Sequence, residues 1–226
     1  MNKILPKITS NISQLAGVIT IVGKAKSGKT SFQKLLVNEF IDLGYDIDFY
    51  IQESKQIGFG DSFNLDGDNI VTIYNKSNLT EIINLVRNSD PTNRVIFIES
   101  IDMLNVLGNL NGYERIFNIM TSLAHLSTWG YIVIIGQNII NRYIGNDIYS
   151  IDTTISTIST VVISLTFNPY QYECVSIVSK LQESFNKPKL KPNFVFNKVK
   201  NRFGSTGKIN AILSPSKNNI GIRIIK

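Results

Sequence analysis

A glycine-rich segment near the start of the chain has the residue types and spacing of a phosphate-binding loop. Residues 23–30 read GKAKSGKT, which fits the P-loop pattern G-x-x-x-x-G-K-[ST]. Glycines at both ends of this pattern allow the backbone to curl, so that successive N–H groups point at phosphate oxygens. Lys29 would carry its ammonium to the β- and γ-phosphates, and the Thr30 hydroxyl would coordinate Mg²⁺. The sequence therefore predicts a site for a nucleoside triphosphate together with Mg²⁺.

The segments on both sides of the loop suit this motif. The β-branched run at 17–22 is typical of a buried strand. Apolar residues then recur at helical spacing between residues 32 and 43, and Gly44 is placed to end that helix. We expect the phosphates to contact Gly23, Lys24, Ala25, Lys26, Ser27, Gly28, Lys29, Thr30 and Ser31.

Two further predicted strands end in carboxylates. The strand at 47–52 is followed by Glu53, and the strand at 95–98 is followed by Glu99. Because the carboxyl ends of parallel strands lie at one edge of a sheet, both glutamates would converge on the phosphates. Hydrolysis needs an acid on the metal side and a group that positions or deprotonates water, and these two glutamates are the candidates.

A third strand pattern, at 131–135, runs into Gly136, Gln137 and Asn138. An amide at a strand end can donate a hydrogen bond to a γ-phosphate or hold its attacking water. The alternative interpretation of Gln137 is a simple turn at the end of a strand.

The remaining segments alternate between strand and helix patterns. We predict strands at 69–74 and 161–167, a helix at 79–87 with Asn78 as its N-cap, and a helix at 113–128. The apolar stripe of the last helix, which should face the core, consists of Ile116, Phe117, Met120, Leu123 and Leu126. This alternation predicts an α/β fold with a mostly parallel central sheet flanked by helices.

Composition excludes several other classes of site. Cys174 is the only cysteine and His125 the only histidine, so a disulfide within the chain, a cysteine-based zinc site and most histidine-dependent triads are excluded. We interpret His125 as a packed or half-exposed helix residue. Apolar runs are far shorter than the roughly 18 to 20 residues that span a bilayer, and the N-terminus lacks a signal-peptide pattern. We therefore expect no membrane insertion and a cytoplasmic location, or an intracellular one in a host cell if the protein is viral.

Charge is segregated along the chain, whose formal net charge is +6. Residues 51–150 hold 6 basic and 10 acidic side chains, whereas the chain after Glu183 has 10 Lys or Arg and no acid. Such a stretch is either a solvated surface or a face that binds a polyanion, and charge alone does not decide between the two.

The order of these features resembles the RecA-type ATPase core. Residues 198–207, KVKNRFGSTG, look very like the K-N-R-F-G motif of RadA-type recombination proteins and are similar to the K-x-R segment of DnaB-type helicases. The resemblance covers nearly the whole chain and implies a single RecA-like domain with a C-terminal β-hairpin region. Its parts would be an arm at 1–16, a nucleotide-binding core at 17–167, an inserted basic loop at 168–192, and the motif with the last strands at 193–226.

The resemblance also implies a role for each candidate residue. Glu53 would be the general base that orients water, Glu99 would hold Mg²⁺ at the Walker B position, and Gln137 would sense the γ-phosphate. Lys200 and Arg202 would reach the nucleotide of a neighbouring subunit. This arrangement implies a homo-oligomeric ring or filament.

The chain departs from the family pattern at the Walker B position. The family normally has Asp at the Walker B position, where this chain has Glu99, so Asp102 is a possible substitute. The Ser/Thr-rich stretch at 139–160, with Arg142 and Tyr143, occupies the place of the family's DNA-binding loop. A plain surface loop fits its composition equally well.

The resemblance implies a DNA-dependent ATPase that acts on single-stranded DNA in recombination or strand annealing. The acid-free basic stretch fits binding to a phosphate backbone. A replicative helicase motor of DnaB type is the first alternative, and a nucleotide-driven regulatory or assembly protein without DNA is the second. A small-molecule kinase would need an arginine-rich lid, and no such cluster precedes Lys198.

Overall fold

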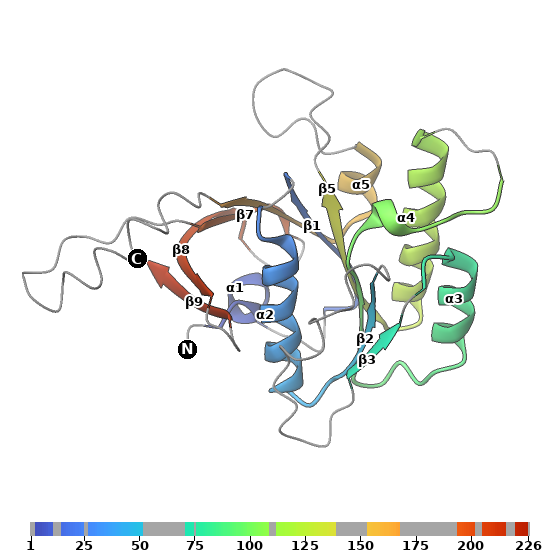
Figure 1. Ribbon diagram of the computed structural model, residues 1–226, viewed down its shortest axis with the longest axis horizontal. Coiled ribbons are helices and arrows are strands. Elements are labelled where there is room, and N and C mark those ends of the chain that lie inside the picture. The colour runs from blue at the N-terminus through green and yellow to red at the C-terminus, as the bar shows by residue number, and fades with distance from the viewer. Residues whose placement is uncertain are drawn as a thin grey trace, which may run out of the picture.

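The computed structural model has a central β-sheet with helices on both faces (Figure 1). It describes residues 3–10, 15–24, 27–51, 71–74, 76–108, 112–138, 153–167, 194–201, 205–215 and 220–225. Among the helices in these ranges, none combines the length and the apolar character that a membrane crossing requires.

The described strands form one sheet of nine, in the order β3-β2-β4-β5-β1-β6-β7-β8-β9. The parallel part consists of β1 (Gly17–Gly23), β2 (Asp46–Tyr50), β3 (Val71–Tyr74), β4 (Arg94–Ile98), β5 (Ile132–Asn138) and β6 (Val161–Phe167). An antiparallel meander follows, made of β7 (Phe194–Asn201), β8 (Gly207–Pro215) and β9 (Ile220–Ile225). The predicted fold class, mostly parallel with C-terminal hairpins, is therefore confirmed.

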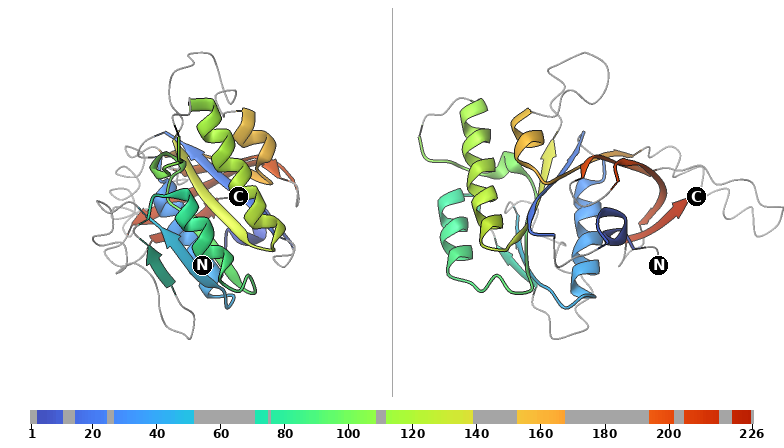
Figure 2. Two further views of the ribbon diagram at one scale, coloured as in Figure 1. Left: turned by 90° about the vertical axis from the view of Figure 1, so that its right-hand side faces the viewer. Right: turned by 180° about the vertical axis from the view of Figure 1, so that it is seen from behind.

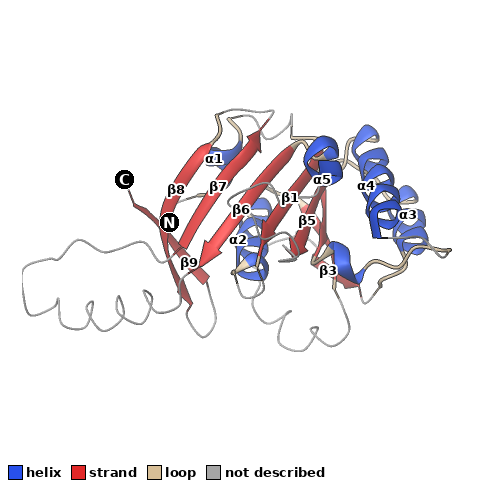
Figure 3. Ribbon diagram, turned by 90° about the horizontal axis from the view of Figure 1, so that it is seen from above, coloured by secondary structure: helices blue, strands red, loops and turns tan. Residues whose placement is uncertain are grey.

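The helices divide between the two faces of the sheet. They are α1 (Leu5–Ile8), α2 (Lys29–Ile41), α3 (Leu79–Arg87), α4 (Gly112–Thr128) and α5 (Thr153–Ile158), with a short 3-10 helix, η4, at Ile101–Met103. Helices α1 and α2 lie on one face, and α3, α4 and α5 lie on the other (Figure 2). Seen from above, the strands lie side by side from β8 and β7 through β6 to β1 and β5 (Figure 3). Each face of the parallel part thus has its own apolar core.

Local sequence signals explain the element boundaries. Every residue of β1 is buried, as expected for a central strand covered on both faces. Asn78 caps α3 as predicted, because its side-chain oxygen accepts the backbone N–H groups of Thr80 and Glu81. Helix α2 ends just before Gly44, whose φ of 84° is the left-handed conformation that glycine adopts without steric cost.

Three expectations for the α4 side of the molecule are corrected. Phe117 is 45% exposed, whereas Ile119, which the predicted stripe did not include, is fully buried. Residues 153–158 form helix α5, where Ile155 packs into the core beside α4, so this part of the 139–160 stretch is not a surface loop. The part at 139–150 lies outside the described residues. His125 lies in the last turn of α4, as expected, but its side chain is exposed rather than packed or half-exposed.

The N-terminal segment packs into the core on the α2 side. Ile4, Leu5 and Ile8 are at most 1% exposed. The carboxylate of Glu39, on α2, accepts the backbone N–H groups of Ile4 and Leu5. The ammonium of Lys198, on β7, donates a hydrogen bond to the carbonyl oxygen of Lys7 over 2.8 Å. The segment therefore connects the helix that follows the P-loop with the first strand of the meander.

Candidate nucleotide-binding site

The P-loop connects the end of β1 with the start of α2. Gly23 is the last residue of β1, and Gly28 is the N-cap of α2 with φ 86° and ψ 17°, so it needs the left-handed freedom of glycine. The first helical hydrogen bond runs from the Phe32 N–H to the Gly28 carbonyl over 2.8 Å. Strand, glycine loop and helix follow one another as predicted, and Ala25 and Lys26 lie outside the described residues.

The described part of the loop is curled tightly on itself. The Ser27 N–H donates to the Lys24 carbonyl over 3.1 Å. A Cβ atom added to Gly23 would come within 2.2 Å of the Ser27 side-chain oxygen, so any other residue there would force Ser27 to shift. Ser27 is 6% exposed, and its hydroxyl has no hydrogen-bond partner in the described part of the chain. A buried hydroxyl without a partner in such a curl fits a bound phosphate that supplies the acceptor.

Three polar side chains occupy the first turn of α2. The ammonium of Lys29 lies over the loop and donates to the carbonyl oxygens of Gly23 at 2.9 Å and Lys24 at 2.8 Å. Thr30 and Ser31 follow it and are half-buried. The N-terminus of a helix attracts anions through its free N–H groups and its dipole. The cationic side chain, the hydroxyls and the helix end therefore converge on one place.

The carboxyl ends of β4 and β5 lie beside this loop. The order β4-β5-β1 makes these strands neighbours, with Ile98 opposite Ile135 and Val22 opposite Gln137. Glu99 follows β4 directly and is 5% exposed, and Gln137 is 8% exposed. The structure thus brings Glu99 and Gln137 to the edge of the sheet at which the P-loop begins.

Asp102, the alternative to Glu99, has a different environment. It is exposed, and its carboxylate accepts the Ser100 hydroxyl at 3.1 Å while its N–H donates to the same hydroxyl. Ser100 thereby caps η4, and Arg115 holds the turn through the carbonyl oxygens of Asp102 and Leu104. Asp102 therefore belongs to the turn that leads away from the strand end where Glu99 lies.

The donor set at this edge suits Mg²⁺ better than a metal that needs many protein ligands. Within the described ranges, no group of three or more His, Cys, Asp or Glu side chains could hold a metal ion. Mg²⁺ is usually held by one or two carboxylates together with nucleotide phosphates and water. The Thr30 hydroxyl and the Glu99 carboxylate would be its protein-side groups.

Other predicted residues are placed in part or not at all. Glu53 and Arg202 lie outside the described residues. The backbone of Lys200 belongs to β7 and pairs with Val162, next to a register shift that leaves Val199 unpaired. The neighbouring Lys198 is 6% exposed, and burial together with the charge of Lys7 lowers its pKa.

Sequence reasoning missed two residues at this site. Gln33, on α2, is fully buried and its amide donates to the Ile98 carbonyl over 2.9 Å. Gly136, on β5, lies so close to β4 that a Cβ atom there would be 2.1 Å from the Glu99 carbonyl oxygen. A glycine inside a strand pattern is a known signal of close backbone approach, so Gly136 could have been found. A single Gln next to an apolar helical stripe gives no such signal.

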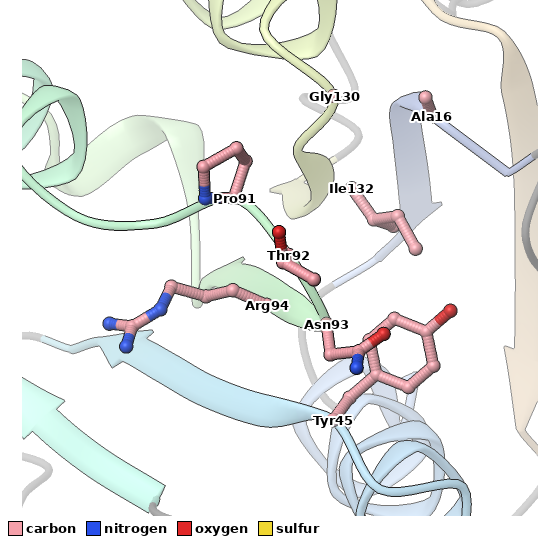
Figure 4. A pocket seen from close by; sticks show the side chains of 8 residues that line it. All are labelled: Ala16, Tyr45, Pro91, Thr92, Asn93, Arg94, Gly130 and Ile132. Atoms are coloured by element: carbon pink, nitrogen blue, oxygen red, sulfur yellow. The ribbon is translucent and has the colours of Figure 1, made fainter.

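A separate pocket lies at the opposite edge of these strands. Its lining includes Tyr45, Thr92, Asn93 and Gly130, near the amino ends of β4 and β5 (Figure 4). The charged lining residue, Arg94, extends away from Tyr45 in Figure 4 and binds the carboxylate of Asp48 at 3.1 and 3.3 Å. Its charge is therefore already balanced, and the pocket is distinct from the phosphate site.

No family model matches the sequence, and no curated protein matches it. Solved structures do match. A DnaB-like replicative helicase, solved in a study of its interactions with primase, has a TM-score of 0.67 and 12% identity, and the match covers 92% of this chain and 57% of that one. A second structure, that of an ATPase domain, has a TM-score of 0.65 and 13% identity, with 91% and 84% covered. The flagellar accessory protein FlaH from Methanocaldococcus jannaschii has a TM-score of 0.62 and 16% identity, with 98% and 95% covered.

These matches extend over nearly the whole chain, although this chain spans little more than half of the DnaB-like helicase. With its P-loop between β1 and α2 and its sheet order, the chain has the fold of the RecA-like P-loop ATPases.

Proposed function

We propose that this protein is a DNA-dependent ATPase that uses Mg²⁺ at the carboxyl edge of β1, β4 and β5. One observation carries the proposal: the P-loop and two buried polar side chains, Glu99 and Gln137, lie at the carboxyl ends of three adjacent strands. A buried carboxylate and a buried amide at this place have no role in packing an apolar core. They have a clear role beside a triphosphate and its metal ion.

Each side chain then has one task. Lys29 neutralises the β- and γ-phosphates, whose charge the α2 N-terminus also favours. Thr30 and Glu99 hold Mg²⁺, which supplies charge neutralisation to the phosphoryl group when bound. Gln137 donates to the γ-phosphate or its attacking water, and Glu53 orients that water as a base.

The proposed reaction also uses a neighbouring subunit. Lys200 and Arg202 would reach the nucleotide of the next copy of the chain, where a guanidinium stabilises charge on the transferred phosphoryl group. The active form is therefore a homo-oligomer, either a ring or a filament.

Two observations support DNA as the partner: the basic charge of the C-terminal stretch, and the similarity of the fold to that of a replicative helicase. The chain after Glu183 carries 10 basic residues and no acid, which suits a phosphate backbone. The similar structure is a DnaB-like replicative helicase. Recombination or single-strand annealing is our first proposal for the process, and replicative unwinding is the alternative.

A second candidate function is a nucleotide-driven assembly protein that does not use DNA. The observation in its favour is that FlaH, a flagellar accessory protein, is matched over almost its entire length, whereas the DnaB-like helicase is matched over 57%. In this case the same ATP site would control assembly, and the basic stretch would bind another anionic partner.

The test is the ATPase rate with and without single-stranded DNA at low and moderate salt, with Lys29→Ala as the control. Stimulation of the wild type that weakens with salt is the expected result, since phosphate contacts depend on ionic strength. ATPase activity that DNA leaves unchanged would favour the assembly protein. Hydrolysis that persists in Lys29→Ala would contradict the P-loop site itself.

A further inference from the structure

Gln33 is a fully buried polar side chain one helical turn after the P-loop threonine. It lies three residues after Thr30 on α2, so the two side chains share a face of the helix. Its amide nitrogen donates to the carbonyl oxygen of Ile98 over 2.9 Å. Since Ile98 is the last residue of β4, this bond connects the P-loop helix with the strand end that carries Glu99.

The backbone at Glu99 is held on three sides. The carbonyl oxygen before it accepts the Gln33 amide. The Glu99 N–H donates to the Tyr50 carbonyl, on β2, over 3.0 Å. The Glu99 carbonyl oxygen packs against Gly136, on β5, where no side chain would fit. Helix α2, strand β2 and strand β5 therefore fix this peptide together, and Gln33 is the side chain among the three contacts.

Packing alone does not account for a glutamine here. The neighbouring buried residues of α2, such as Phe32 and Leu36, are apolar. The Gln33 side-chain oxygen is buried and has no hydrogen-bond partner among the described residues, which is costly for a polar atom. A leucine or methionine of similar volume would fill the space without that cost. The hydrogen bond from the Gln33 amide to the Ile98 carbonyl oxygen therefore explains why a glutamine stands at this position.

We infer that Gln33 is a positioning residue that sets the place of Glu99 relative to Thr30, and so the spacing of the two groups proposed to hold Mg²⁺. This inference rests on the proposed ATPase function. It assigns Gln33 no contact with the nucleotide, because its amide acts through the Ile98–Glu99 peptide. Loss of that amide should therefore weaken the use of Mg²⁺ more than the binding of nucleotide.

The test is the ATPase rate of Gln33→Met as a function of Mg²⁺ concentration. Groups that orient metal ligands typically contribute 10- to 100-fold, so we expect kcat to fall by about tenfold or more. The Mg²⁺ concentration for half-maximal rate should rise, while the Kd for ADP measured without Mg²⁺ stays within about twofold. Gln33→Leu, a second apolar variant, should behave in the same way if Gln33→Met folds poorly.

A double-mutant cycle separates positioning from general destabilisation. In a Glu99→Gln background, Gln33→Met should cause no further loss of rate, because the group that it positions is already gone. The matched control is Tyr131→Phe, which also removes a side-chain donor to backbone carbonyl oxygens, those of Val86 and Ser89 at 2.8 and 2.7 Å, near the opposite edge of the sheet. It should lower thermal stability and leave the Mg²⁺ dependence unchanged.

The outcomes distinguish this inference from the proposed function. A wild type without Lys29-dependent hydrolysis overturns the proposed function and this inference with it. A wild type that hydrolyses ATP, together with a Gln33→Met protein of normal kcat and normal Mg²⁺ dependence, overturns the inference alone. Losses that are additive with Glu99→Gln, or that Tyr131→Phe reproduces, also overturn it.

Discussion

The carboxylate of Glu39 accepts the backbone N–H of Leu5 over 2.8 Å, and it accepts the N–H of Ile4 as well. Its side chain is 9% exposed, on the helix that follows the P-loop. Burial raises the pKa of Glu39, although both N–H groups and the charge of Lys3 act in the opposite direction. The carboxylate therefore binds the backbone of the N-terminal segment, although its burial removes it from water, which is unfavourable for a charged group.

This raised pKa predicts a pH dependence of stability. Above the ordinary value of 4.5, the folded chain still binds a proton at Glu39 that the unfolded chain has released. The free energy of unfolding of the wild type, relative to Glu39→Gln, should therefore fall as pH rises through this window. Urea unfolding between about pH 4 and pH 8 measures it. Glu81→Gln, at an exposed carboxylate on α3, is the control and should change stability by less than about 0.5 kcal/mol. A difference that grows with pH would contradict the assignment.

The two candidate metal-side acids can be separated by substitution. Glu99→Gln should lower the ATPase rate by about 10²-fold or more, as expected for loss of a positioned catalytic group. Asp102→Asn should change the rate by less than about twofold, since this exposed carboxylate lies in the turn after β4, where it accepts the Ser100 hydroxyl. Steady-state rates at saturating Mg²⁺ give the comparison. The reverse order of effects would move the metal site to the turn after β4.

Gly136, on β5, lies so close to the end of β4 that even an alanine side chain should disturb the site. In Gly136→Ala, the new Cβ would lie 2.1 Å from the Glu99 carbonyl oxygen, so β4 or β5 must shift. We expect a loss of about 1–3 kcal/mol in stability together with a large loss of ATPase activity. Gly44→Ala is the matched control, because it has free space but a φ of 84°. It should cost about 1–2 kcal/mol and keep normal activity, and equal activity of the two variants would argue against the role of this contact.

The proposed shared site predicts complementation between two inactive proteins. Arg202→Ala should bind ATP but hydrolyse it about 10³- to 10⁵-fold more slowly, and Lys29→Ala should not hydrolyse it. Mixed in equal amounts, they form up to about a quarter of interfaces with an intact Lys29 on one side and an intact Arg202 on the other. ATPase activity should therefore reappear on mixing. If both variants fold and assemble with each other but the mixture stays inactive, Arg202 does not act at the ATP site of the neighbouring subunit.

The order of elements and the phosphate loop could be predicted from sequence because their signals are local. The β-branched run of β1, the Asn78 cap and the spacing from Gly23 to Thr30 each depend on a few consecutive residues. The expectation that the strand ends followed by Glu53 and Glu99 lie at the edge of the P-loop needed only the parallel arrangement of strands, and the structure places Glu99 there.

Other features depend on contacts between distant segments. The β-branched composition of 153–158 disfavours a helix, yet burial of Ile155 beside α4 stabilises one. The hydrogen bond between Gln33 and Ile98 joins residues 65 positions apart, and no periodicity in the sequence predicts it. The apolar side chain of Phe117 places it in the predicted stripe of α4, but the helix turns Ile119 into the core and leaves Phe117 exposed.

The hydrogen bond between Lys198 and Lys7 joins residues that are 191 positions apart in the chain. During synthesis, which adds about 5–20 residues per second, this contact cannot form until β7 has left the ribosome. Glu39 becomes available much earlier and can hold Ile4 and Leu5 in the meantime. The core around Ile4, Leu5 and Ile8 is thus completed only after the meander has been translated, and a nascent chain cut short before β7 would keep part of that apolar surface uncovered.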